Sequence, residues 1–294
     1  YTDEEIKDMS DEEYRNNLYS LWTNYCVSES YEPGSTFKPV TVASALEEGV
    51  VKDGDTYVCK GFETVADYKL KCHVFSTIGS HGSLTVEQAL MNSCNPYMIH
   101  LALEMGNSRF AYYQSLFGFG KITGIDLPGE TTGIVYGDRM TTIDAACNSF
   151  GQTINVNMMQ MMAAYCSIIN GGMLYQPHIV KRIESANGEV VKEYKANLVR
   201  QTITASTSKL LRRYLKNTVE EGTAKKAGVT GYSVAGKTGT AQKGDRKDNK
   251  WIISFIGHAP AENPKFAIYV VIDEPYGTTG TSGSSADVLT LTHN

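Results

Sequence analysis

The chain has 294 residues, of which 41% are hydrophobic, and its net charge is −5. A chain of this length can bury a large core, and we expect residues 1–294 to form one domain of two lobes. The mild negative charge, without a basic stripe between aromatic residues, argues against binding of nucleic acid. The longest apolar runs, at 252–256 and 266–272, have the length of strands and are too short to cross a bilayer.

The first predicted element is a helix that begins after Ser10. Ser10 and Glu13 have the spacing of a capping box. Apolar side chains then recur at helical spacing, at Tyr14, Leu18, Leu21, Trp22 and Tyr25. We expect this apolar face to pack on the main body. The acidic residues that precede the helix indicate a solvated surface, and no signal peptide is visible.

The next helix carries Ser35 and Lys38. Pro39 has no N–H group and is tolerated only in the first turn of a helix, so the helix must begin near Ser35. Gly49 is expected to end it. Ser35 then lies at the positive end of the helix dipole, near unpaired backbone N–H groups.

The middle of the chain is mainly helical. Residues 85–105 have a helical pattern that is interrupted around Ser93-Cys94-Asn95-Pro96. A turn-rich segment at 118–130 follows. Residues 158–169 form a buried helix that ends at Gly171-Gly172, and its methionines are expected to lie in the core.

The final third of the chain is rich in strands. Strands are expected at 232–242, 251–258 and 266–272, the last two joined by a hairpin connection at 259–264. Lys237-Thr238-Gly239-Thr240 lies in the first of them. The absent side chains of Gly236 and Gly239 would let a peptide-like substrate lie along the strand edge.

Three short motifs together predict an acyl-transfer site. They are Ser35-Thr36-Phe37-Lys38, Ser93-Cys94-Asn95 and Lys237-Thr238-Gly239. Lys38 follows Ser35 by three residues, so both side chains share one helix face. A serine is a weak nucleophile without a neighbouring base, and a lysine can be that base only when its pKa is lowered. We expect the charge of Lys237 to contribute to that lowering.

The other two motifs supply the remaining parts of such a site. Ser93 would connect Lys38 with Lys237 and relay a proton toward the leaving group, while Asn95 would hold a substrate amide and fix Lys38. Lys237 and the hydroxyl groups of Thr238 and Thr240 suit a terminal carboxylate. The N–H groups of Thr240 and Ser35 would form an oxyanion hole.

With these motifs, the chain resembles the transpeptidase domain of class B penicillin-binding proteins over almost its whole length. The nucleophile segment at 31–39 is similar to that of the family. Further segments match the secondary signatures of the family, at 92–96, 123–130, 150–152, 170–172, 221–224, 234–242 and 255–257. These secondary matches carry no obvious chemistry, so they indicate common descent.

The resemblance implies an α+β fold, with a five-stranded antiparallel sheet flanked by helices and an adjoining helical lobe. It implies a serine-type D,D-transpeptidase that cross-links peptidoglycan stem peptides through a Ser35 acyl-enzyme and is acylated by β-lactams. No cofactor is required for this catalysis. The implied location is the extracytoplasmic face of a bacterial membrane, with an N-terminal anchor and a pedestal domain outside this chain. Implied partners are a membrane glycosyltransferase and the proteins of elongation, division or sporulation.

Three other functions share parts of this chemistry. A serine β-lactamase needs a base for water, and no Glu-x-x-Leu-Asn segment, such as class A enzymes use, occurs between Asn95 and Lys237. A D,D-carboxypeptidase would use water in place of the amine. An antibiotic sensor domain would be acylated without transfer to an acceptor.

Two cysteines raise a separate question. A hairpin that turns near Val65-Ala66 would place Cys59 opposite Cys72, which suits either a disulfide or two thiolates on zinc. The family often has a Cys…Cys…Gly-His-Gly pattern here. For a structural Zn²⁺ we favour Cys59, Cys72 and His81, with Asp67 as the fourth ligand and His73 as the alternative.

Overall fold

The computed structural model describes residue 7 and residues 9–244 and 250–275. Its α-helices are α2 (Asp11–Leu21), α3 (Tyr25–Ser28), α4 (Lys38–Glu48), α5 (Val86–Met91), α6 (Asn95–Met105), α7 (Asn107–Leu116), α8 (Thr142–Asn148), α9 (Met158–Ile169) and α10 (Ala205–Glu220). Short 3₁₀ helices are η1 (Gly34–Phe37), η2 (His73–Ser76), η3 (Gly137–Arg139) and η4 (Lys225–Ala227). In this part of the chain, no helix has the length and apolar character that crossing a membrane requires.

The strands form one central sheet and several hairpins. They are β1 (Thr56–Cys59), β2 (Phe62–Val65), β3 (Tyr68–Lys71), β4 (Gly82–Thr85), β5 (Met173–Gln176), β6 (Arg182–Glu184), β7 (Val190–Glu193), β8 (Asn197–Gln201), β9 (Ala235–Lys243), β10 (Lys250–Ala259) and β11 (Phe266–Asp273). The central sheet is antiparallel in the order β11-β10-β9. The resemblance implied five strands; among the described residues this sheet has three.

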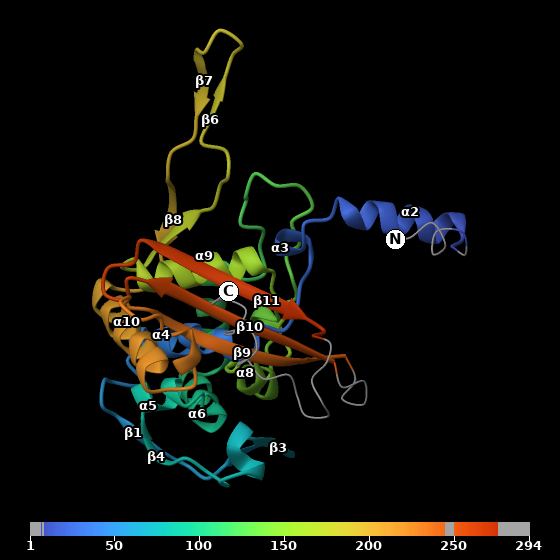
Figure 1. Cartoon of the computed structure of the whole chain (residues 1–294). Helices are drawn as coiled ribbons and strands as arrows, with labels where there is room; N and C mark the ends of the chain where they lie inside the picture. The colour runs from blue at the N-terminus through green and yellow to red at the C-terminus, as the bar shows by residue number, and fades with distance from the viewer. Residues whose placement is uncertain (1–6, 8, 245–249, 276–294) are drawn as a thin grey trace.

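The hairpin between β10 and β11 confirms the connection expected at 259–264, with Ala259 opposite Phe266. On its other side β10 pairs with β9, and Phe255 lies opposite Thr238. Among the described residues, β9 is therefore one edge strand of this sheet and β11 is the other. Strand β9 packs against η1 and α10, while α9 packs against β11. Figure 1 shows the sheet in the middle of the molecule, with helices around it.

The nucleophile helix confirms the sequence prediction in detail. Its first turn is the 3₁₀ segment η1, α4 continues from Lys38, and Pro39 lies in the first turn of α4. Gly49 ends α4 in the left-handed conformation, at φ 76°, and its N–H group donates to Ala45 and Leu46. Most of α4 is buried, so the helix lies inside the molecule and cannot shift without disturbing the core.

The first helix corrects one prediction. Helix α2 has the expected capping box at Ser10 and Glu13, but none of its residues is buried. Leu21 and Trp22 are 69% and 77% exposed. In Figure 1, α2 extends away from the body. The prediction that its apolar face packs on the body is wrong, because no described surface lies against that face.

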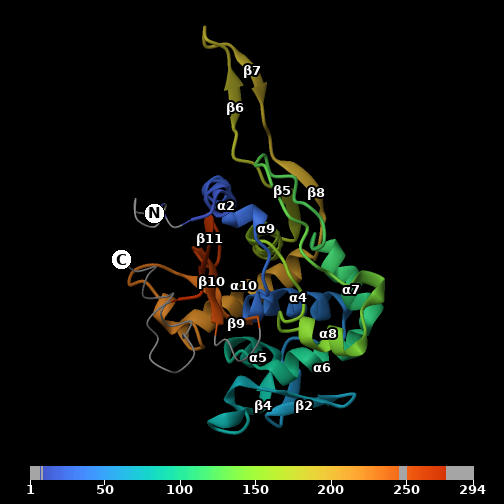
Figure 2. The same ribbon diagram turned by 90° about the vertical axis from the view of Figure 1, so that its right-hand side faces the viewer.

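Two hairpins lie at the margins of the body. The turn between β2 and β3 contains Ala66, at φ 51°, which confirms the predicted turn near Val65-Ala66. The pair β6–β7 continues from β5 and β8 and projects far from the body in both views (Figures 1 and 2). All residues of β6 and β7 are exposed. This arm therefore makes no contribution to the core.

Candidate active site

The nucleophile turn is held against the edge strand of the sheet. The N–H group of Gly34 donates to the carbonyl oxygen of Gly151 at 2.9 Å. Gly34 has φ 56°, and a Cβ atom there would lie 2.6 Å from the carbonyl oxygen of Thr240. A side chain at position 34 would therefore separate η1 from β9. The arrangement places Ser35 beside the Lys237 strand, as the sequence predicted.

Lys38 is completely buried and makes three hydrogen bonds. Its Nζ donates to the carbonyl oxygen of Ser93 at 2.6 Å, to Oδ1 of Asn95 at 2.7 Å and to Oγ of Ser93 at 3.0 Å. Burial lowers the pKa of Lys38 to about 8, although the nearby thiols of Cys72 and Cys94 act in the opposite direction. A lysine with this pKa is partly neutral near physiological pH and can accept a proton.

Ser93 connects the lysine with the nucleophile. Its Oγ lies 3.0 Å from Oγ of Ser35 and 3.0 Å from Nζ of Lys38. Among the hydrogen bonds of the described residues, this is the path from Ser35 to Lys38. The expected connection from Ser93 to Lys237 is not formed. The relay therefore runs between the nucleophile and Lys38.

Lys237 is also completely buried, on β9. Its Nζ donates to the carbonyl oxygen of Thr238 at 3.0 Å and lies 3.5 Å from Oγ1 of the same residue. Burial, and then the charge of Lys38, hold the pKa of Lys237 well below its ordinary value. We expected Lys237 to lower the pKa of Lys38. In the structure burial is the main cause of the lowered pKa of both lysines, and their positive charges repel each other.

The two glycines of the β9 motif lie in close contact with neighbouring elements. A Cβ atom at Gly239 would lie 2.5 Å from Oγ of Ser254 and 2.8 Å from Cγ2 of Thr36. At Gly236 it would lie 2.5 Å from the ring of Phe255. These glycines therefore permit close packing of β9 on η1 and β10. The room that they would leave for substrate at the strand edge stays a prediction.

The turn that carries Ser93 has a strained backbone, and contacts from other segments of the chain stabilise it. Ser93 has φ 54°, a left-handed conformation that costs about 1–2 kcal/mol for a residue with a side chain. The N–H and hydroxyl groups of Thr223 both donate to the carbonyl oxygen of Met91, at 3.0 and 3.1 Å. The segment at 221–224, one of the secondary signatures with no obvious chemical role, therefore stabilises this turn.

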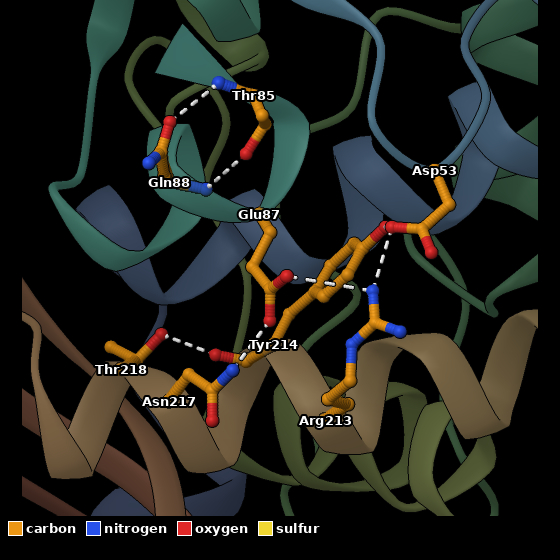
Figure 3. A network of polar contacts seen from close by, with 8 residues as sticks. All are labelled: Asp53, Thr85, Glu87, Gln88, Arg213, Tyr214, Asn217 and Thr218. Atoms are coloured by element: carbon orange, nitrogen blue, oxygen red, sulfur yellow. Dashed lines mark hydrogen bonds and ion pairs between the residues drawn. The ribbon is translucent and has the colours of Figure 1, made fainter.

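Helix α10 also stabilises this turn, through polar contacts with α5. Asn217 donates to Glu87 at 2.6 Å, and Arg213 forms ion pairs with Glu87 and with Asp53, at 3.4 and 2.6 Å. Figure 3 shows these side chains of α10 reaching toward α5 and toward the loop that carries Asp53. Since α5 ends at Met91, the network fixes the helix that leads directly into Ser93.

A cysteine cluster lies on the other side of this turn. The ligand atoms of Cys59, Cys72, His81 and Cys94 all lie within 4.8 Å of one another. Nδ1 of His81 is 3.5 Å from Sγ of Cys72 and 3.9 Å from Sγ of Cys59. All six cysteines of the chain are free thiols, so no disulfide joins Cys59 and Cys72. The β2–β3 hairpin does not place Cys59 opposite Cys72, as we expected, because Cys59 pairs with Gly82 of β4.

Sequence reasoning found three members of the cluster and missed Cys94. The expected fourth ligand, Asp67, is exposed in the β2–β3 turn and does not belong to the cluster. The alternative, His73, is also outside it, although its Nδ1 lies 3.8 Å from Sγ of Cys72. Cys94 was available as a signal, because it is a cysteine within the Ser93-Cys94-Asn95 motif. The motif thus joins the cluster to the candidate active site.

The strand that precedes Cys72 also contacts the motif. Nδ2 of Asn95 donates to the carbonyl oxygen of Lys71 at 3.3 Å, while its Oδ1 accepts from Lys38. The hairpin β2–β3 is therefore connected to Lys38 through one amide side chain.

Comparisons with known proteins agree with this geometry. The chain matches the penicillin binding protein transpeptidase domain family over residues 2–290. It is 42% identical over 269 residues to stage V sporulation protein D of Bacillus subtilis, covering 90% of this chain and 41% of that protein. It is 32% identical over 257 residues to peptidoglycan D,D-transpeptidase FtsI of Escherichia coli, covering 86% and 41%. The chain thus spans about two fifths of the length of these curated relatives.

Solved structures give the same result for the fold. Penicillin binding protein 3 from Mycobacterium tuberculosis, complexed with aztreonam, superimposes with a TM-score of 0.81 at 29% identity, covering 90% of this chain and 62% of that one. A D,D-transpeptidase domain from Eggerthella lenta gives a TM-score of 0.80 at 26% identity, covering 95% and 71%. The α+β fold is therefore the one that the sequence predicted. The chain belongs to the penicillin-binding protein transpeptidase family.

Proposed function

We propose that this domain is a peptidoglycan D,D-transpeptidase that works through an acyl-enzyme on Ser35. The observation that carries the proposal is the continuous contact from Ser35 through Ser93 to the buried Lys38, beside the Lys237 strand. A hydroxyl, a relay and a base of lowered pKa are what serine acyl transfer needs. No cofactor takes part in these steps.

Acylation follows from this geometry. Oγ of Ser35 attacks the carbonyl carbon of the penultimate D-alanine of a stem peptide, and its proton passes through Ser93 to neutral Lys38. When the tetrahedral intermediate collapses, the C–N bond breaks and the terminal D-alanine leaves as an amine that takes up this proton. A neutral amine of a second stem then attacks the Ser35 ester, and its proton passes through Lys38 and Ser93 to Oγ of Ser35 as the acyl C–O bond breaks. This step forms the cross-link and releases the serine.

The Lys237 strand orients this substrate. Lys237 and the hydroxyl groups of Thr238 and Thr240 would bind the terminal carboxylate. The N–H groups of Ser35 and Thr240 would bind the developing oxyanion, and each such donor is worth about 2.7–4 kcal/mol in the transition state. The close approach of Gly34 to the carbonyl oxygen of Thr240 supports this pairing, because it brings the two backbone segments together.

Transfer to an amine is favoured over transfer to water. One relative carries the name peptidoglycan D,D-transpeptidase, and another is a sporulation protein. The similar structure of penicillin binding protein 3 complexed with aztreonam supports covalent inhibition of this chain by β-lactams, because β-lactams mimic the D-alanyl-D-alanine end of the stem peptide. A peptidoglycan substrate places the domain on the extracytoplasmic face of the membrane. An N-terminal anchor and partners among the glycosyltransferases and the elongation, division or sporulation proteins follow by analogy with the family.

We also propose that the cysteine cluster binds a structural Zn²⁺. Three thiolates and one imidazole are a common zinc-ligand set, and structural sites of this kind have four protein ligands in a tetrahedron. Ligand atoms within 4.8 Å of one another need only small movements to reach Zn–S distances of about 2.3 Å. In this proposal Cys94 replaces Asp67 as the fourth ligand, and Zn²⁺ would hold the Ser93 turn in place.

The transferase can be tested with a stem pentapeptide, with and without a D-amino acid as acceptor. We expect release of D-alanine in both cases and an exchanged peptide when the acceptor is present. Ser35→Ala is expected to abolish both products and all labelling by a fluorescent penicillin. Hydrolysis that the acceptor leaves unchanged would indicate a carboxypeptidase. A penicillin adduct that is lost within minutes would indicate a β-lactamase, and acylation without any peptide product would indicate a sensor.

The base can be tested by the pH dependence of acylation. Because Lys38 acts when it is neutral and its pKa is about 8, the rate of penicillin acylation should rise about tenfold per pH unit below pH 8 and level off above it. Lys38→Ala should lower this rate by about 10²–10⁴-fold and remove the rise. Lys209→Ala, an exposed lysine on α10, is the matched control. A profile that Lys38→Ala leaves intact would contradict the assignment.

The metal can be tested by elemental analysis of protein purified without chelators. We expect about one zinc per chain, and much less in Cys94→Ser, because three ligands remain. Cys147→Ser, a buried cysteine outside the cluster, should retain the metal. Less than about 0.2 zinc per chain in the unmodified protein would contradict the proposal. In that case a disulfide within the cluster becomes the alternative.

A further inference from the structure

A cavity of about 470 Å³ lies beyond the Thr240 end of β9. Gln242 and Lys243 of β9, Glu29 and Glu32 of the segment before Ser35, and Gln152 next to Gly151 are among its lining residues. Both segments that border the nucleophile turn thus form part of its wall, since Gly34 is hydrogen-bonded to Gly151. None of the residues assigned to catalysis lines it. The cavity therefore adjoins the active site without being part of it.

A stem peptide that lies along β9 runs toward this cavity. This step rests on the proposed function, in which the terminal carboxylate lies at Thr238 and the penultimate carbonyl at the Thr240 N–H group. The C-terminal end of the peptide therefore lies at Thr238, and the residues before it lie progressively farther along β9, past Thr240. A strand advances about 3.3 Å per residue, so the next residue of the stem lies level with 241–242. A side chain there would lie next to Gln242 and Lys243, which line the cavity.

The cavity carries an excess of negative charge. Its titratable acidic and basic residues are Glu29, Glu32, Asp273 and Lys243, three carboxylates against one ammonium group. Lys243 is already paired with Asp273 at 2.9 Å, and the hydroxyl group of Tyr25 also donates to Asp273. The two glutamates therefore face the cavity without a cation from the described residues.

Glu32 is the better placed of the two glutamates. It is half-buried, while Glu29 is exposed. Its Oε1 accepts one hydrogen bond, from the N–H group of Thr153 at 2.9 Å, and burial raises its pKa. A carboxylate that is partly removed from water and holds one hydrogen bond has capacity for a cationic donor.

The chemistry of cross-linking supplies such a cation. When two stems of the same kind are joined by an amine, every stem must carry a side-chain amine, including the stem that acts as donor. The acceptor enters where the terminal D-alanine leaves, which is the Thr238 end of the strand. The donor's own amine must therefore be accommodated at the opposite end, where it is protonated and not reacting.

We propose that this cavity binds the side-chain ammonium group of the donor stem, at the residue just before the acylated D-alanine, and that Glu32 is its main acceptor. A hydrogen bond between an ammonium group and a carboxylate gives about tenfold or more in affinity. The domain thereby selects donors with a basic side chain at this position. Glu32 acts as a specificity-determining residue, three positions before the nucleophile.

The proposal can be tested with two pentapeptides that differ only at this residue, one with lysine and one with norleucine. Each is measured as a competitor of labelling by a fluorescent penicillin and as a donor that releases D-alanine. The wild-type protein should bind the lysine peptide about tenfold more tightly. Glu32→Gln should reduce this preference to less than about threefold, because glutamine keeps the hydrogen bond from Thr153 but lacks the charge. Glu12→Gln, an exposed glutamate on α2, should retain the preference.

Other outcomes separate the two proposals. Equal competition by the two peptides in the wild-type protein, or a preference that survives in Glu32→Gln, would overturn the role of the cavity. Competition without release of D-alanine from either peptide would overturn the proposed function and leave the preference measurable. Gln242→Glu, which adds a carboxylate to the same cavity wall, should increase the preference for lysine; a decrease would also contradict the proposal.

Discussion

The burial of one amine, Lys38, is the constraint on which the rest of the site depends. An ammonium group without contact to water is costly unless several acceptors surround it. Ser93 and Asn95 supply three acceptors; Ser93 lies in the turn between α5 and α6, and Asn95 is the first residue of α6. The same burial lowers the pKa of Lys38 to about 8. Burial therefore prepares the amine as a base, while the contact with Ser93 places the relay hydroxyl next to Ser35.

This requirement explains why so much of the structure converges on the Ser93 turn. The turn is in a strained left-handed conformation at Ser93, and such strain persists only when the surroundings hold it. Thr223 donates hydrogen bonds to Met91, just before the turn, and Cys94, which follows Ser93, belongs to the cysteine cluster. Strand β9 closes the site from the other side, where its glycines allow direct packing on η1. The result is a base, a relay and a nucleophile on three elements that cannot move independently.

Local patterns predicted the parts of this arrangement that are encoded within a few residues. Pro39 determined the start of the nucleophile helix, and the hairpin between β10 and β11 followed from two strand-length apolar runs joined by the connection at 259–264. The sequence could not show that the relay joins Ser35 to Lys38, because that depends on a left-handed turn at Ser93. Cys94 was missed in the cluster because it lies in the turn before α6, while the other three ligands come from the strand segment at 59–81. The prediction for α2 failed because an apolar helix face does not reveal whether a partner surface exists.

A crystal structure of the penicillin acyl-enzyme tests the central claim most directly. We predict continuous electron density from Oγ of Ser35 to the opened lactam carbonyl, with the acyl oxygen about 2.7–3.1 Å from the N–H groups of Ser35 and Thr240. Lys38 should remain within hydrogen-bond distance of Ser93 in that structure. An adduct on another residue, or an acyl oxygen directed away from Thr240, would contradict the account.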